Sequence, residues 1–133
     1  MKNSLLISTN TQSTILAIVR MVFGFFLIFH GWEIFSAEKM NGYQEWNKFS
    51  GQYGMVMVYL GKGAELAAGI LIMIGWHTRF ASIIALLTMG YIAFFVGNGK
   101  IWYEDQHPFM FVLLALMYFA LGGGKWSVDE IRN

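Results

Sequence analysis

The chain has 133 residues, of which 56% are hydrophobic and only 13% carry a charge, and its mean hydropathy is +0.51. These values are typical of a membrane protein and exclude an ordinary water-soluble domain of this length. The net charge of +1, without any basic block, argues against nucleic acid as a partner, and the absence of cysteine excludes disulfide frameworks, thiol chemistry and iron–sulfur clusters.

Four apolar stretches predict helices long enough to cross a bilayer, at a rise of about 1.5 Å per residue. They predict an all-α fold in a single domain, residues 1–133, arranged as a four-transmembrane-helix antiparallel bundle. The connection at residues 36–52 mixes charged and aromatic side chains, which predicts a short interfacial segment between helices 1 and 2. The predicted helices span residues 14–35, 53–75, 80–96 and 108–121.

The start of the chain predicts a retained span. Residues 1–13 are polar and are expected at the membrane surface, with Ser13 or Thr14 capping the first helix. The apolar run at residues 15–35 is too long for a signal-peptide core and is interrupted by Arg20. Four spans place both termini on one side, and an excess of positive charge there favours cytoplasmic termini. Lys2, Arg20, Arg79, Lys125 and Arg132 are expected on or near that side, and Lys39, Lys48 and Lys100 on the other.

Glu65 lies in the middle of the second predicted helix, where a charge is costly in hydrocarbon and normally faces other helices or a wet cavity. Gly61 and Gly69 lie one turn to either side, so the carboxylate is expected on a closely packed face. Arg20 is expected to be its partner, at a depth that differs by roughly 6 Å. Lys62 either pairs with Glu65 or extends along its own helix. The charged pair either fixes helix register or forms a ligand or proton site.

The remaining polar residues carry weaker signals. His30 and Glu33 have the i, i+3 spacing that fits one metal, but a polar helix end explains both residues without one, and no metal site is predicted. Glu104, Asp105 and His107 form either an acidic site or, the interpretation we favour, a solvated charge cluster. We expect no facing histidines between helices, which argues against haem. The chain contains no self-sufficient catalytic motif, and the catalytic residues are unknown.

Several short motifs, taken in order, resemble those of the DoxX family over nearly the whole chain. They are Arg20, Gly24 and His30-Gly31; Gly61, Glu65 and Gly69; His77-Thr78-Arg79-Phe80-Ala81; and residues 122–124 followed by Ser127-Val128-Asp129. One departure is that the family often has a lysine a few residues after the His-Gly pair, where this chain has Glu33 and Ile34. The role of that lysine is therefore not carried over.

The resemblance implies a four-helix integral protein of the bacterial inner membrane. It also implies a link to membrane redox systems, since family members include subunits similar to those of thiosulfate:quinone oxidoreductase and proteins of oxidative-stress defence. Relatives in the wider superfamily act as assembly or cargo factors, so the resemblance predicts the fold better than the activity.

Our first hypothesis is a redox-linked accessory subunit that binds a quinone or a similar amphipathic molecule between its helices. A quinone headgroup needs one or two hydrogen-bond partners and apolar walls. The ligand-binding residues under this hypothesis are Arg20, His30, Lys62 and Glu65. The alternatives are a non-enzymatic membrane scaffold or assembly factor and a small transporter. The lipid bilayer is the expected partner in each case, together with a partner protein or further copies of the chain.

Overall fold

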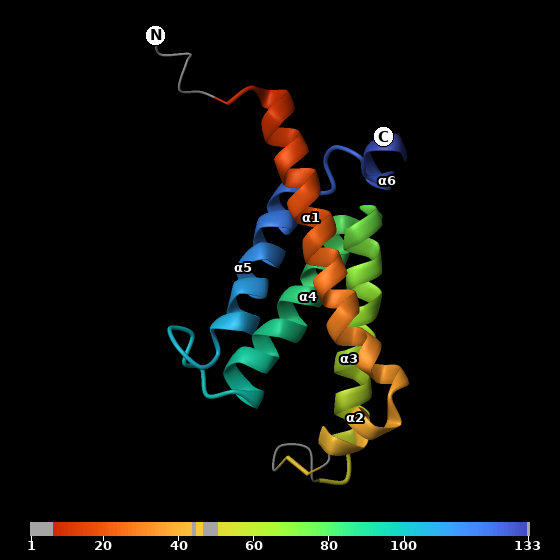
Figure 1. Ribbon diagram of the computed structural model, residues 1–133, viewed down its shortest axis with the longest axis vertical. Helices are drawn as coiled ribbons and strands as arrows, with labels where there is room; N and C mark the ends of the chain where they lie inside the picture. Colours follow the sequence, from red (N-terminus) through yellow and green to blue (C-terminus); the bar gives the residue numbers. More distant parts are fainter. Residues whose placement is uncertain (1–6, 44, 47–50, 133) are drawn as a thin grey trace.

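The computed structural model describes residues 7–43, 45–46 and 51–132. Every regular element in these residues is helical, as the composition predicts (Figure 1). The longer helices are α1 (Thr9–Gly31), α3 (Gly54–Ile74), α4 (Thr78–Tyr91) and α5 (Gln106–Leu121). The shorter elements are the 3₁₀ turn η2 (Trp32–Phe35), α2 (Ala37–Tyr43), the π-helical turn η4 (Ile92–Val96) and α6 (Val128–Arg132).

The first helix begins at Thr9 rather than at residue 14, because its cap is Ser8 and not Ser13 or Thr14. The Ser8 hydroxyl accepts a hydrogen bond from the backbone N–H of Thr11 at 3.2 Å. A serine in this position satisfies one of the amides that a helix start leaves without a partner. The predicted end was also too long for one regular helix, since the last four residues tighten into η2.

Most of the other boundaries agree with the predicted ones to within about two residues. The exception is the end of the third predicted helix, since α4 ends at Tyr91 and the π-helical turn η4 continues to Val96. Helix α3 ends at Gly75, which has a φ of 74°, a conformation that glycine adopts without steric cost. Helix α4 starts at Thr78 instead of 80. Helix α5 starts at Gln106, with Pro108 in its first turn, where the missing proline N–H costs no hydrogen bond.

In the part of the chain that the structure describes, three helical segments are long and apolar enough to cross a membrane: Thr9–Phe35, Gly54–Ile74 and Thr78–Val96, of 27, 21 and 19 residues. Helix α5 is equally apolar but has 16 residues. Large apolar side chains point outward from these segments, among them Phe29, Phe35 and Phe80, each more than 60% exposed. Water is an unfavourable solvent for so large an apolar surface, whereas lipid chains cover it readily. The outer faces of the helices are therefore lipid-facing.

Helices α1 and α3 pack backbone to backbone through glycines. A Cβ built on Gly24 would lie 2.6 Å from the Met73 nitrogen, and one built on Gly69 would lie 2.7 Å from the Ile28 nitrogen. Gly31 makes the same kind of approach to Leu66, at 2.5 Å from its nitrogen. Small residues allow such close contact inside a membrane, where dispersion replaces the hydrophobic effect as the attraction between helices.

The buried core lies where α1 meets α3, α4 and α5. Phe23 of α1 lies beside two rings of α5, with centroid distances of 5.7 Å to Phe111 and 6.2 Å to Tyr118. Fully buried alanines, Ala81 and Ala85 on α4 among them, keep the neighbouring helices close. The rest of this core consists of Leu27, Ala68, Ile72, Met89 and Ala115.

The two ends of the molecule differ (Figure 1). The described N-terminal residues, the turn between α3 and α4, and α6 lie toward the upper end of the view, which we call the terminal end. Helix α2 and the loop before α5 lie toward the lower end. Part of the predicted interfacial segment is thus α2, which packs on α3 through Met40 and Val58; Lys48 and Phe49 lie outside the described residues, as does Lys2.

Candidate functional site

Arg20 holds the C-terminal loop against the helices at the terminal end. It is completely buried, and its guanidinium donates to four backbone carbonyls. The acceptors are Ile72 of α3 at 3.1 Å, Gly123 at 2.5 Å, Lys125 at 2.9 Å and Trp126 at 3.1 Å. The loop has irregular backbone, with positive φ at two of its glycines and at Trp126, so its carbonyls lack helical partners. A planar fork of five N–H groups suits this task.

The predicted Arg20–Glu65 pair is therefore wrong. Arg20 extends toward the terminal end and uses its donors on the loop, while Glu65 pairs with Lys62. The reasoning from depth considered only the two helices. It omitted the C-terminal residues, which return to the bundle and bring several carbonyls to Arg20, more than 100 positions further along the chain.

The C-terminal segment forms α6 and caps α4. The Asp129 carboxylate accepts hydrogen bonds from the backbone N–H groups of His77 at 2.7 Å and Thr78 at 2.9 Å. Burial by itself raises the pKa of Asp129, but these hydrogen bonds outweigh it and hold the pKa below its ordinary value. Ser127 in turn accepts from the Glu130 N–H and donates to the Gly124 carbonyl. Internal hydrogen bonds thus hold the C-terminal segment against the helices at this end of the protein.

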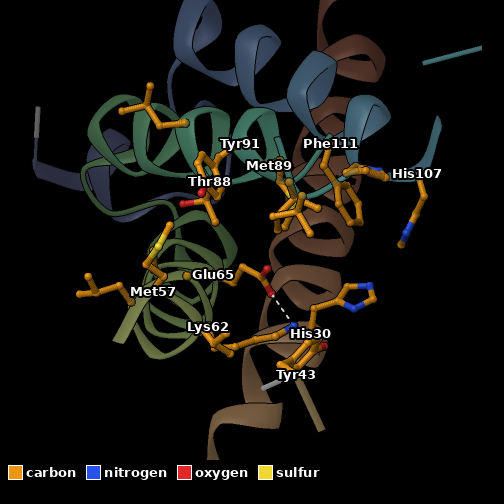
Figure 2. Close-up of a pocket in the computed structure, with 18 of the residues that line it drawn as sticks. His30, Tyr43, Met57, Lys62, Glu65, Thr88, Met89, Tyr91, His107 and Phe111 are labelled. Atoms are coloured by element: carbon orange, nitrogen blue, oxygen red, sulfur yellow. Dashed lines mark ion pairs between the residues drawn. The ribbon is translucent and has the colours of Figure 1, made fainter. Parts of the chain in front are cut away.

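A cavity of about 610 Å³ lies toward the other end, between α3, α4 and the start of α5 (Figure 2). Most of its lining is apolar, and four polar or charged side chains, those of His30, Tyr43, Lys62 and Glu65, gather at one side of it. Its volume lies in the range of small-molecule sites. The apolar lining includes Met57, Val58, Leu60, Leu87, Met89, Ile92, Val96 and Phe111, and the polar lining includes His30, Tyr43, Lys62, Glu65, Thr88 and His107.

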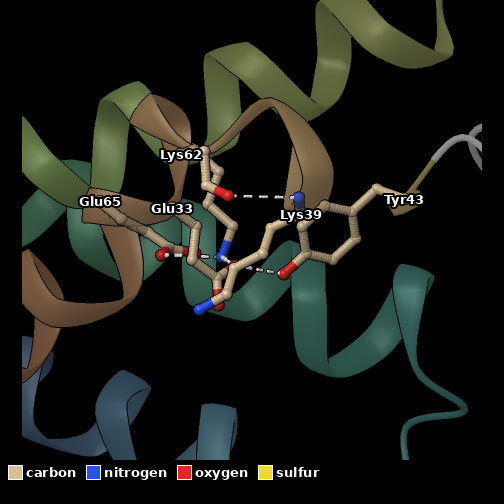
Figure 3. A network of polar contacts seen from close by, with 6 residues as sticks. Glu33, Lys39, Tyr43, Lys62 and Glu65 are labelled. Atoms are coloured by element: carbon tan, nitrogen blue, oxygen red, sulfur yellow. Dashed lines mark hydrogen bonds and ion pairs between the residues drawn. The ribbon is translucent and has the colours of Figure 1, made fainter. Parts of the chain in front are cut away.

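A chain of charged contacts lies at the polar side of this cavity, with Lys62, Glu65 and Tyr43 in the lining and Glu33 outside it (Figure 3). The Lys62 ammonium lies 3.1 Å from a Glu33 oxygen and 3.5 Å from a Glu65 oxygen, so it bridges two carboxylates. The Tyr43 hydroxyl of α2 donates to Glu33 at 2.6 Å, and burial together with that hydrogen bond raises the pKa of Tyr43. The Lys62 ammonium also lies 5.2 Å from the centre of the Tyr43 ring, within reach of a cation–π contact. Glu65 itself is only 2% exposed.

His30 and His107 meet at the edge of the cavity. Their ring centroids are 5.3 Å apart, and both rings contact Phe111, at 6.1 Å and 4.9 Å. The expectation that no two histidines face each other was wrong, because the first turn of α5 brings His107 against α1. Glu33 contacts Lys62 and Tyr43 and does not complete a ligand set with His30. No group of three His, Asp or Glu side chains with metal-binding geometry occurs among the described residues.

The acidic residues before α5 serve the loop. Asp105 accepts hydrogen bonds from the backbone N–H groups of Asn98 at 2.9 Å and Lys100 at 3.0 Å, and it is 9% exposed. The favoured interpretation of a solvated cluster therefore fails for Asp105, while Glu104 is exposed and contacts Asn98 and Lys100. His107 lines the cavity, whereas Glu104 and Asp105 do not.

Of the four predicted ligand-binding residues, His30, Lys62 and Glu65 line the cavity and Arg20 does not. The sequence interpretation missed Tyr43, and it assigned His107 and Glu33 to other roles. Helical spacing within one helix predicts the contact between Lys62 and Glu65. No comparable signal places Tyr43 of α2 beside α3, because that contact depends on how the connection after α1 folds back.

The described structure has three helical segments long and apolar enough to cross a bilayer, with large apolar side chains exposed to the surroundings. It is an integral, multi-pass membrane protein. The chain belongs to the DoxX family, whose family model matches residues 15–98 and confirms the resemblance seen in the motifs. No curated protein and no solved structure matches the chain. The matched region covers most of α1 and extends through η4, and it includes His30, Glu33, Lys62 and Glu65.

Proposed function

We propose that the protein is a four-span antiparallel bundle of the bacterial inner membrane with cytoplasmic termini. Helix α5 supplies the fourth span, since its 16 residues extend about 24 Å and the loop before it adds length. It packs along α4 in Figure 1 and ends beside α1, where the Tyr118 hydroxyl donates to the Leu16 carbonyl. The terminal end carries Arg79, Lys125 and Arg132 in addition to the buried Arg20, which supports the proposed orientation.

Single cysteines test this topology cleanly, because the chain contains no cysteine. Tyr103→Cys lies in the exposed loop before α5, and Ile131→Cys lies in exposed α6. In intact spheroplasts a membrane-impermeant maleimide is expected to label the first variant and to reach the second only after permeabilisation. Labelling of both variants in intact cells would contradict four spans, and labelling of only the second would reverse the orientation.

We further propose that the cavity binds a small amphipathic molecule, such as a quinone, and that the protein is a redox-linked accessory subunit. The observation that carries this proposal is the combination of an apolar cavity with a polar side formed by Lys62 and Glu65, where Glu33 contacts Lys62 from outside the lining. A ligand that arrives through the lipid needs both features: apolar walls for its ring or tail and polar groups for its headgroup. Membership of the DoxX family supports the redox link.

Filling the cavity tests the proposal. Gly61 lines the cavity, and a Cβ built on it meets no atom within 4 Å, so Gly61→Phe places a ring there without a backbone clash. We expect at least a tenfold loss of affinity, about 1.4 kcal/mol, for a benzoquinone with a decyl chain, measured by calorimetry in detergent. Gly90→Phe is the matched control, because Gly90 is equally unobstructed but does not line the cavity. Equal affinities in both variants and the unmodified protein would place the binding elsewhere, and no binding to the unmodified protein would refute the proposal.

A membrane scaffold or assembly factor is the second candidate function. The terminal end favours it, because Arg20 and Asp129 use their polar groups for internal hydrogen bonds. Their role there is to stabilise the fold. A scaffold is expected to keep its partner in a pull-down after Gly61→Phe, whereas a ligand-dependent subunit loses function with the ligand. We propose that contact with a partner protein or a second copy uses the exposed apolar faces in either case.

A further inference from the structure

One carboxylate oxygen of Glu65 has no hydrogen-bond donor within the polar network of the cavity. This atom, Oε2, is buried and receives no hydrogen bond from any described residue, although it lies 3.5 Å from the Lys62 ammonium. A buried carboxylate oxygen without a hydrogen bond is costly, because it has lost its water and gained no donor in return. Glu65 belongs to the cavity lining, so a molecule in the cavity can reach it.

The nearest donors are already committed. The Lys62 ammonium lies 3.1 Å from Glu33 and 5.2 Å from the centre of the Tyr43 ring. It lies 3.5 Å from Glu65 Oε2, where it forms an ion pair but no hydrogen bond. The Tyr43 hydroxyl donates to Glu33. The Thr88 hydroxyl, across the cavity, donates to the Ile84 carbonyl at 2.8 Å. His30 and His107 can each donate or accept, so they do not select between the two kinds of ligand.

We infer that the molecule bound here presents a hydroxyl donor to Glu65 Oε2, and that the cavity selects phenols and hydroquinones over quinones and ethers of the same shape. The inference rests on the proposed function. A quinone oxygen only accepts hydrogen bonds, so it would compete with two carboxylates for Lys62 and leave Oε2 without a donor. A phenolic O–H supplies the missing donor and keeps the Lys62 contacts intact. Its ring lies against apolar walls that include Met89 and Phe111 (Figure 2).

The first test uses two probes that differ only in the donor: 4-heptylphenol and its methyl ether, 4-heptylanisole. Calorimetry on the full chain in detergent is expected to show at least a tenfold tighter Kd for the phenol, as suits a hydrogen bond to a buried carboxylate. Equal affinities overturn the inference and leave the proposed cavity standing. Failure of both probes to bind overturns the proposed function and the inference with it.

A substitution of Glu65 tests whether this residue causes the preference for the phenol over the ether. Glu65→Leu removes the acceptor and leaves Lys62 paired with Glu33, so the phenol and the ether are expected to bind within about twofold of each other. Retained affinity for the ether reports that the variant is folded with its cavity intact. Glu38→Leu, on an exposed position of α2 outside the cavity lining, is the matched control and keeps the tenfold preference. A preference that survives Glu65→Leu overturns the inference.

A comparison of a hydroquinone with its quinone tests whether a reduced quinone can supply the hydroxyl donor. A decyl hydroquinone is expected to bind at least tenfold more tightly than the corresponding decyl benzoquinone, under anaerobic conditions that keep the first reduced. Tighter binding of the benzoquinone overturns the inference while it supports the proposed function, so the two failures are distinguishable.

Discussion

Gly24→Ala is expected to destabilise the protein by more than about 3 kcal/mol, a larger effect than most added methyl groups have in a packed interior. The new Cβ would lie 2.6 Å from the Met73 nitrogen and 2.7 Å from the Gly69 carbonyl oxygen, both backbone atoms of α3. A flexible side chain can rotate away from such a contact, but helix backbone cannot, so α1 and α3 must separate along their shared face. Unfolding in mixed detergent micelles with rising dodecyl sulfate, followed by circular dichroism, measures the loss.

Gly90→Ala is the control for this experiment. A Cβ on Gly90 meets no atom within 4 Å, so alanine at this position is expected to leave stability unchanged or to raise it by up to about 1 kcal/mol through helix propensity. If both variants unfold at the same detergent composition as the unmodified protein, the close contact between α1 and α3 is absent in the membrane protein.

Arg20→Met is expected to cost more than about 3 kcal/mol and to release the C-terminal loop. The substitution leaves the Ile72, Gly123, Lys125 and Trp126 carbonyls without their donor in a buried place. Arg20→Lys keeps the charge but loses the fork, so it is expected to recover only part of the stability. The same unfolding assay measures the loss, and protease cleavage within residues 122–132 reports release of the loop. Unchanged cleavage in Arg20→Met would contradict the role assigned to Arg20.

Exchange of Arg20 and Glu65 distinguishes a role of Arg20 at the C-terminal loop from a direct ion pair between Arg20 and Glu65. If Arg20 and Glu65 were partners, the double variant Arg20→Glu, Glu65→Arg would restore much of the stability that either single variant loses. The structure predicts the opposite, because the exchange places a carboxylate among carbonyls at one end and an arginine beside Lys62 at the other. Restoration of stability in the double variant would therefore support the pair that the helix depths suggested.

The contacts that the sequence predicted correctly are mostly local. Lys62 and Glu65 lie three positions apart on one helix, so their proximity follows from helix geometry before any tertiary contact forms. The prediction of a closely packed face around Glu65 was correct for one of the two glycines that flank it. Gly69 does pack against α1, but Gly61 faces open space and lines the cavity. Spacing predicts which residues share a helix face, but it does not predict whether the neighbour is another helix or a cavity.

The contacts that sequence reasoning missed depend on chain segments that leave a helix and return. His107 meets His30 because the loop before α5 closes through Asp105, and Tyr43 meets Glu33 because α2 folds back after η2. Neither of these two contacts is indicated by the periodicity of the sequence. Each is decided by a loop conformation that hydrogen bonds across the connection stabilise, from Asn98 and Lys100 to Asp105 in one case and from Tyr43 to Glu33 in the other.

By itself, the sequence determined that this is a helical membrane protein of the DoxX family with costly charges in its interior. Long apolar runs and local capping residues suffice for that, because each helix satisfies its own backbone in lipid. Only the tertiary structure decided where each charge finds its partner. Arg20 holds the C-terminal loop and Glu65 faces a cavity, because the direction of a buried side chain depends on which polar groups the rest of the chain brings within its reach.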